Sequence, residues 1–71
     1  MNEPAIRIEV NGAERSVPAG TTVAGLLALL EIDPRRSAVE LNRSIVRKSE
    51  HATTVLSAGD RVEVVTLVGG G

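Results

Sequence analysis

The sequence predicts a small α+β roll, in which one main helix lies across one face of a mixed sheet of four to five strands. A hairpin pattern opens the chain, one amphipathic helix follows, and a strand pattern lies close to the C-terminus. Because the helix then acts as a crossover, we expect the first and last strands to pair in parallel at the sheet centre. The 71 residues allow a single domain.

The first hairpin is predicted by alternation and by its turn. Apolar and polar residues alternate over residues 6–10, which is typical of a strand with one buried face. Asn11 and Gly12 follow at once, and both tolerate the positive φ angles of a two-residue turn. A second strand should then cover residues 14–17 and end at Pro18, which cannot donate to a central ladder.

The helix is predicted between a threonine cap and a proline. Thr21 or Thr22 can cap the first turn, and Asp33 with Pro34 should stop the helix. Gly25 lies inside the helix, where we expect it to mark a close approach of the helix to the sheet. The apolar stripe has helical spacing and consists of Val23, Leu26, Leu27 and Leu30.

The second half of the chain predicts short elements. A third strand should cover residues 38–41, and a turn at residues 42–44 leads into Ile45-Val46. Residues 47–52 have no clear period and form either a loop or one turn of 3₁₀ helix. Residues 53–56 favour a short edge strand.

The last strand breaks its own alternation near the end of the chain. Residues 61–64 alternate regularly, but Val65, Leu67 and Val68 are then all apolar. This pattern indicates either a bulge or an outer sheet face that stays apolar. Two interpretations follow: the loop at residues 47–52 buries these side chains, or they dock a partner.

The sequence stops in the glycines Gly69, Gly70 and Gly71. Glycine brings no side-chain burial and loses the most entropy on ordering. We therefore expect a domain at residues 1–68 and a flexible tail at residues 69–71. Such a tail presents one group, the α-carboxylate of Gly71, and is thin enough to enter a channel in a partner. The alternative is an inert, linker-like end.

Composition argues against several function classes. The chain has no cysteine and no aromatic residue, so it lacks a cysteine nucleophile or metal ligand and the stacking platforms of single-stranded nucleic-acid binders. Its net charge of −1 does not favour nucleic acid or anionic membranes. No stretch predicts a membrane span or signal peptide, so we expect a soluble cytoplasmic protein with no bound metal or cofactor.

No catalytic constellation is predicted. His51 is the only histidine and lies in an irregular polar stretch, where we expect it to be solvated. Asp33 and Asp60 adjoin turns, where aspartate forms local hydrogen bonds. We therefore expect no catalytic residue and no enzymatic activity of the chain's own.

The order of elements and the terminal glycines resemble the ubiquitin-like sulfur carriers, most closely the ThiS family of thiamine biosynthesis. This resemblance implies a ubiquitin-like β-grasp fold. Many members end in two glycines, whereas this chain ends in three, so the reacting carboxylate would belong to Gly71. The resemblance rests on Val10-Asn11-Gly12, Gly20-Thr21-Thr22-Val23, Leu26-Leu27, Val39-Glu40-Leu41-Asn42, Ile45-Val46-Arg47, Ser49-Glu50-His51, residues 59–65 and the final glycines.

The resemblance also implies a reaction that other proteins carry out on this one. An E1-like adenylyltransferase would use ATP and Mg²⁺ to convert the Gly71 carboxylate to an acyl-adenylate. Sulfur from the persulfide of a donor protein would displace AMP, and the resulting thiocarboxylate would supply sulfur to thiazole synthase. Gly69 and Gly70 would enter the partner's active site, with Val65, Leu67 and Val68 docking beside it.

Four alternatives stay open. The small subunit of molybdopterin synthase has a similar fold and tail, but its tail usually carries a proline before the glycines, which this one lacks. The chain could instead carry sulfur for another biosynthesis, such as that of cysteine. It could be a protein modifier joined through Gly71 to a lysine, or an interaction domain whose tail is inert.

Overall fold

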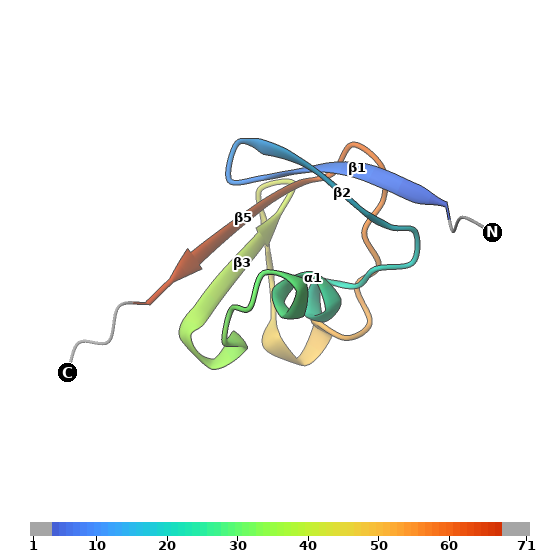
Figure 1. The fold of residues 1–71 in the computed structure, drawn as a ribbon. Coiled ribbons are helices and arrows are strands. Elements are labelled where there is room, and N and C mark those ends of the chain that lie inside the picture. The colour runs from blue at the N-terminus through green and yellow to red at the C-terminus, as the bar shows by residue number, and fades with distance from the viewer. Residues whose placement is uncertain (1–3, 68–71) are drawn as a thin grey trace.

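The structure is a computed structural model that describes residues 4–67, and it has the predicted roll architecture. Five strands form one mixed sheet in the order β2-β1-β5-β3-β4, and the helix α1 lies across one face (Figure 1). The central strands β1 and β5 pair in parallel, as the order of elements predicted. The elements are β1 Ala5–Val10, β2 Ala13–Pro18, α1 Val23–Leu29, β3 Ser37–Leu41, β4 Ser44–Val46 and β5 Arg61–Thr66, with 3₁₀ helices η1 Pro34–Arg36 and η2 Lys48–Glu50.

Both hairpins turn through two residues in the left-handed backbone region. In the β1–β2 turn, Asn11 has φ 50° and Gly12 has φ 85°. In the β3–β4 turn, Asn42 has φ 50° and Arg43 has φ 72°. Because Arg43 carries a Cβ, its conformation costs about 1–2 kcal/mol that Gly12 avoids.

Helix α1 begins at a threonine cap and ends before the predicted stop. Thr22 is the cap, since its Oγ1 accepts the Gly25 N–H at 3.0 Å. The helix ends at Leu29, and Pro34 opens η1 instead. A Cβ on Gly25 would meet Thr22 Oγ1 at 3.4 Å and Thr21 Cγ2 at 3.5 Å. The glycine therefore lies against the cap, and the predicted close approach to the sheet is wrong.

The core fills the space between α1 and the inner face of the sheet. It is wholly aliphatic, in keeping with a sequence that has no aromatic residue. Fully burying one such side chain stabilises the fold by about 1.5–3 kcal/mol. The buried residues come from α1, every strand and the segment before β5: Ile8, Val10, Val17, Val23, Leu26, Leu27, Val39, Val46, Leu56, Val62 and Val64.

His51 is buried, and the prediction that it is solvated is wrong. Its side chain is only 5% exposed. Its Nε2–H donates to the Val46 carbonyl at 3.2 Å, and its own carbonyl accepts the Ala24 N–H at 2.8 Å. The histidine thus joins the end of β4 to the first turn of α1.

Residues 53–56 do not form the predicted edge strand. Only an isolated bridge between Thr22 and Val55 is present there. The backbone instead bonds to the start of the helix, because the Val23 N–H donates to the Thr54 carbonyl at 2.9 Å. The segment therefore lies alongside the start of α1 and does not extend the sheet.

The two aspartates have the local roles that the sequence predicted. Asp33 caps η1 by accepting the Arg35 N–H at 2.9 Å, and hydrogen bonds from the Arg35 side chain and backbone lower the pKa of the Asp33 carboxyl. Asp60 Oδ2 accepts the Ser57 N–H at 2.7 Å in the turn before β5. Both carboxylates are therefore engaged in turns.

Candidate functional site

Strand β5 leads to the C-terminal tail and is paired without interruption along β3. Its register runs from Val62 opposite Leu41 to Thr66 opposite Ser37. The Leu67 N–H extends the ladder by donating to the Arg36 carbonyl at 2.6 Å. There is thus no bulge between residues 61 and 66, and the bulge interpretation of the broken alternation is wrong.

Two asparagines from the hairpin turns hold β5 from its two sides. Asn11 Oδ1 accepts the Val64 N–H at 2.8 Å, and Asn11 Nδ2 donates to the Val64 carbonyl at 3.2 Å. On the β3 side, Asn42 Oδ1 accepts the Arg61 N–H at 2.9 Å, and Asn42 Nδ2 donates to Asp60 Oδ1 at 3.0 Å. Side-chain amides therefore fix both the start and the later half of the strand.

The outer face of the sheet, opposite α1, is apolar near the end of β5. Val65 and Leu67 are each 59% exposed, which confirms that they leave the core face and excludes their burial by the loop at residues 47–52. Ala38 lies directly opposite Val65. Ile45 is 75% exposed and shares a shallow depression with Ala38 and Leu67. We call Ala38, Ile45, Val65 and Leu67 the outer apolar patch.

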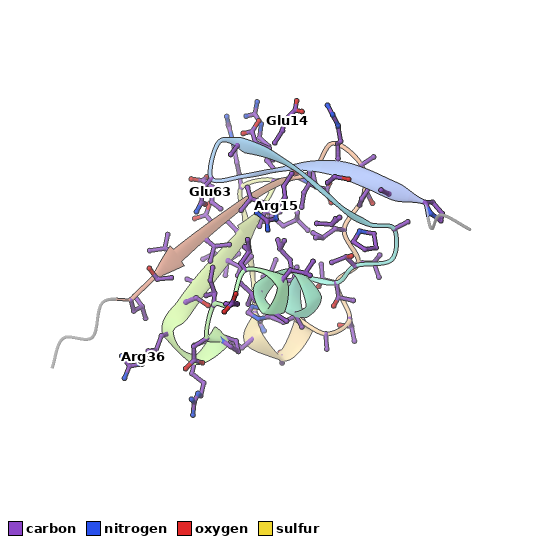
Figure 2. The ribbon with its side chains drawn as sticks, viewed as in Figure 1. Glu14, Arg15, Arg36 and Glu63 are labelled. Carbon is purple, nitrogen blue, oxygen red and sulfur yellow. The ribbon has the colours of Figure 1, made fainter. Side chains whose placement is uncertain are left out.

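The outer apolar patch is bordered by acidic residues on one side, whereas Arg47 and Lys48 line the depression that it contains on the other. Glu40 and Glu63 lie directly opposite one another on β3 and β5, and Figure 2 shows Glu63 on the side of β5 that faces away from the helix. Neither carboxylate takes part in an ion pair within residues 4–67. Opposed like charges are mildly destabilising, so the Glu40–Glu63 side of the border suits a partner that supplies a cation beside an apolar surface.

Sequence reasoning missed Ala38 and Ile45 as members of this patch. The alternation in β4 carries a signal for Ile45, because Val46 is buried and its neighbour must then face outward. No local signal places Ala38 and Ile45 beside Val65 and Leu67. That juxtaposition depends on the strand order.

The other predicted site residues, Val68, Gly69, Gly70 and Gly71, lie outside the described residues. The proposed boundary between the domain and the tail lies there as well. The structure describes β5, the strand that precedes them in the sequence. The assignment of Gly71 as the reacting residue stays a prediction.

A groove on the helix side offers a second concave surface. It has a volume of about 470 Å³ and is lined by residues of α1, η1 and η2, with His51 and Lys48 at its wall. The His51 ring already donates to the Val46 carbonyl, and no residue of β5 lines this groove. Among residues 4–67, no group of three or more His, Cys, Asp or Glu comes together to hold a metal ion. No helix of that part of the chain is long and apolar enough to cross a membrane.

Comparison with known sequences places this chain beside proteins of thiamine biosynthesis. The sequence model of the ThiS family matches residues 3–71. Thiazole synthases of Paramagnetospirillum magneticum and Magnetococcus marinus are 42% and 39% identical over 66 residues, which make up 93% of this chain but 20% of each relative. The chain thus spans about a fifth of the length of these enzymes. The uncharacterized protein ycf40 of Pyropia yezoensis is 35% identical over 93% of both chains.

The fold is also found in a solved structure. The crystal structure of the thiamine biosynthesis protein ThiS of Geobacter metallireducens matches with a TM-score of 0.80 and 29% identity, over 93% of this chain and 100% of that one. This match confirms the ubiquitin-like β-grasp fold that the resemblance implied.

Proposed function

This chain belongs to the ThiS family, and we propose that it is a sulfur carrier whose Gly71 carboxylate becomes a thiocarboxylate for thiazole formation in thiamine synthesis. In this role the protein is a co-substrate of other enzymes and performs no catalysis itself. The match to a structure of a thiamine biosynthesis protein supports the assignment.

The chemistry follows from the poor reactivity of a carboxylate. An adenylating enzyme would join the Gly71 carboxylate to AMP, using ATP and Mg²⁺ and releasing pyrophosphate. A persulfide sulfur of a donor protein would then attack the activated carbonyl and displace AMP. Reduction of the resulting acyl disulfide by a thiol would release the thiocarboxylate. The carrier contributes docking and the positioning of its terminus.

Thiazole synthase is the proposed acceptor of the sulfur. Two relatives named thiazole synthase contain a segment similar to this chain within a much longer polypeptide. Such covalent linkage raises the effective concentration of two groups that must meet. The same encounter in separate proteins would need a docking surface, for which the outer apolar patch is suited.

One observation carries the proposal. A strand held on both sides by backbone pairs and by two asparagine amides lies just before the terminal glycines in the sequence. Its outer face is apolar at Val65 and Leu67, immediately before the tail. Rigid presentation of a thin terminus beside an apolar docking face is what a carrier requires.

The direct test is an intact-mass spectrum after incubation with ATP, Mg²⁺, a persulfide donor and the adenylating enzyme of the same organism. We expect a mass gain equal to one oxygen replaced by one sulfur, localised to Gly71 by fragmentation. A chain lacking Gly70 and Gly71 is the control and should stay unmodified. An unchanged mass, with the enzyme active on a known carrier, would contradict the proposal, and lysine-linked conjugates would indicate a protein modifier.

Docking has its own test with a matched control. The double variant Val65→Ser/Leu67→Ser should raise the KM of the adenylating enzyme for the carrier by about tenfold, because central apolar contacts dominate interface energies. Leu29→Ser/Val55→Ser is the control, since those side chains are 52% and 56% exposed and lie outside β5. Equal KM values for the two double variants would show that Val65 and Leu67 do not dock.

A further inference from the structure

The backbone of β5 bonds alternately to its two neighbours. The N–H and C=O groups of the odd-numbered residues point toward β3. The Asn42 N–H donates to the Arg61 carbonyl at 2.8 Å, and the Leu67 N–H donates to the Arg36 carbonyl at 2.6 Å. The backbone groups of the even-numbered residues point toward β1, since the Val62 carbonyl accepts the Asn11 N–H at 2.9 Å. The N–H and C=O of Thr66 therefore point to the β1 side of the strand.

In the part of the chain that the structure describes, no strand pairs with Thr66 on the β1 side of β5. The pairing of β1 with β5 ends at Val10 opposite Val62, and the side-chain amide of Asn11 supplies the next two bonds, both to Val64. The chain then turns away through Gly12, and Figure 1 shows this turn falling short of the end of β5. Within residues 4–67, no hydrogen bond from β1 or its turn reaches Thr66.

We propose that this open edge of β5, at the N–H and C=O of Thr66, is where an extended strand of the adenylating enzyme adds to the sheet. The inference rests on the proposed function and specifies how the partner holds the carrier. The partner strand would occupy the position beside Thr66 that β1 leaves after Asn11. The outer apolar patch would lie beside it, on the face of the same strand.

Two features of the chain favour a strand as the occupant. Residues 69–71 are all glycine, so only backbone groups are available to recognise them, and strand addition binds through backbone groups. Exposed strand edges are usually protected by proline or charged residues, yet residues 64–68 contain neither. Thr66 itself is exposed, and within residues 4–67 its N–H and C=O donate or accept no hydrogen bond on the β1 side that would compete with a partner.

A proline at position 66 tests the inference. Thr66→Pro removes the N–H that faces the open edge and leaves the bonds of Val65 and Leu67 toward β3 intact, since proline is tolerated where a strand edge faces solvent. Thr66→Val is the matched control, because it keeps the N–H and changes only the hydroxyl. We expect the KM for the carrier in ATP–pyrophosphate exchange to rise about tenfold or more for Thr66→Pro and to stay within about twofold for Thr66→Val.

Amide hydrogen exchange gives a readout that does not depend on the variants. In the free wild-type protein, the Thr66 amide should exchange fast while the Val65 amide, bonded to β3, is protected. Adding the adenylating enzyme should protect Thr66. Circular dichroism tests whether Thr66→Pro is folded. If it is folded, a loss of binding does not come from unfolding; if it is unfolded, the exchange result for the wild-type protein decides.

Several outcomes would overturn the inference. One is an equal KM for both variants together with an unprotected Thr66 amide in the complex. Another is loss of concentration-dependent self-association in Thr66→Pro with an unchanged KM, which would show that the edge pairs two copies of this chain. If the wild-type protein is not adenylated at all, the proposed function fails, and that result is distinct from failure of the edge contact alone.

Discussion

The two hairpin turns both hold strand β5 through an asparagine side chain, but they do so in different ways. Each places an asparagine with φ 50° at its first position, and each asparagine holds the backbone of β5. Asn11 forms both bonds with the backbone of Val64, in a partly buried setting. Asn42 bonds to the backbone of Arg61 and the carboxylate of Asp60, in an exposed setting. One asparagine therefore replaces strand pairing, and the other reinforces a turn.

The difference shows how one strand can be rigid and yet keep a free edge. Asn42 fixes the start of β5, where both neighbouring strands are present. Asn11 satisfies the last position that β1 can serve, and the backbone groups of Thr66 beyond it carry no hydrogen bond on that side within residues 4–67. If the proposed strand addition holds, the boundary between intramolecular and intermolecular pairing coincides with the Asn11 side chain.

The largest expected effect is the loss of the Asn11 amide. Asn11→Gly keeps the positive φ accessible and removes two bonds to a partly buried backbone, so we expect the free energy of unfolding to fall by about 2–3 kcal/mol. Urea denaturation measures this change. A loss below that of Asn42→Gly would contradict the distinction between the two turns.

Asn42→Gly is the matched variant in the second turn. Its two lost bonds are exposed, so water can replace them, and we expect a loss of about 1 kcal/mol. Because both variants introduce glycine at φ 50°, the entropy gained by the unfolded chain is the same and cancels in the comparison. Asn42→Gly should leave the KM for the carrier unchanged, whereas Asn11→Gly should raise it by disordering the end of β5.

Gly12→Ala tests the backbone strain of the first turn. No atom lies within 4 Å of the added Cβ, so only the φ of 85° opposes the change. We expect destabilisation of about 1 kcal/mol, measured by thermal unfolding. An unchanged melting temperature would mean that the turn relaxes without cost.

The smallest expected effect is Arg43→Gly in the second turn. Glycine relieves the strain of φ 72° but raises the entropy of the unfolded chain, and these contributions nearly cancel. We expect a change within about 0.5 kcal/mol, in either direction, by urea denaturation. A loss comparable to that of Asn42→Gly would show that the Arg43 side chain itself stabilises the turn.

Local patterns predicted β1, β2, β3 and β5, though not each boundary, whereas β4 was foreseen only as the stretch after a turn. The alternation over residues 6–10 and 61–64 indicated half-buried strands, and a threonine cap at Thr21 or Thr22 with its apolar stripe indicated the helix. These signals worked because strand and helix periods report which side of an element is buried. They failed at residues 53–56, whose β-branched residues lie alongside the start of α1. They also failed at His51, which is buried with its ring bonded to the Val46 carbonyl.

The sequence by itself determined the roll, the two turns, the placement of Val65 and Leu67 off the core face, and the glycine end, because each depends on the chemistry of neighbouring residues. That Val65 and Leu67 are exposed, and not covered by the loop at residues 47–52, came from the structure. Only the tertiary structure decided that Ala38 and Ile45 join those two side chains, that Asn11 and Asn42 reach β5, and that Thr66 has an open edge. These features depend on strand order and register between segments that lie more than 15 residues apart. A local pattern shows which face of a strand is buried, but it does not contain the identity of the strand's neighbour.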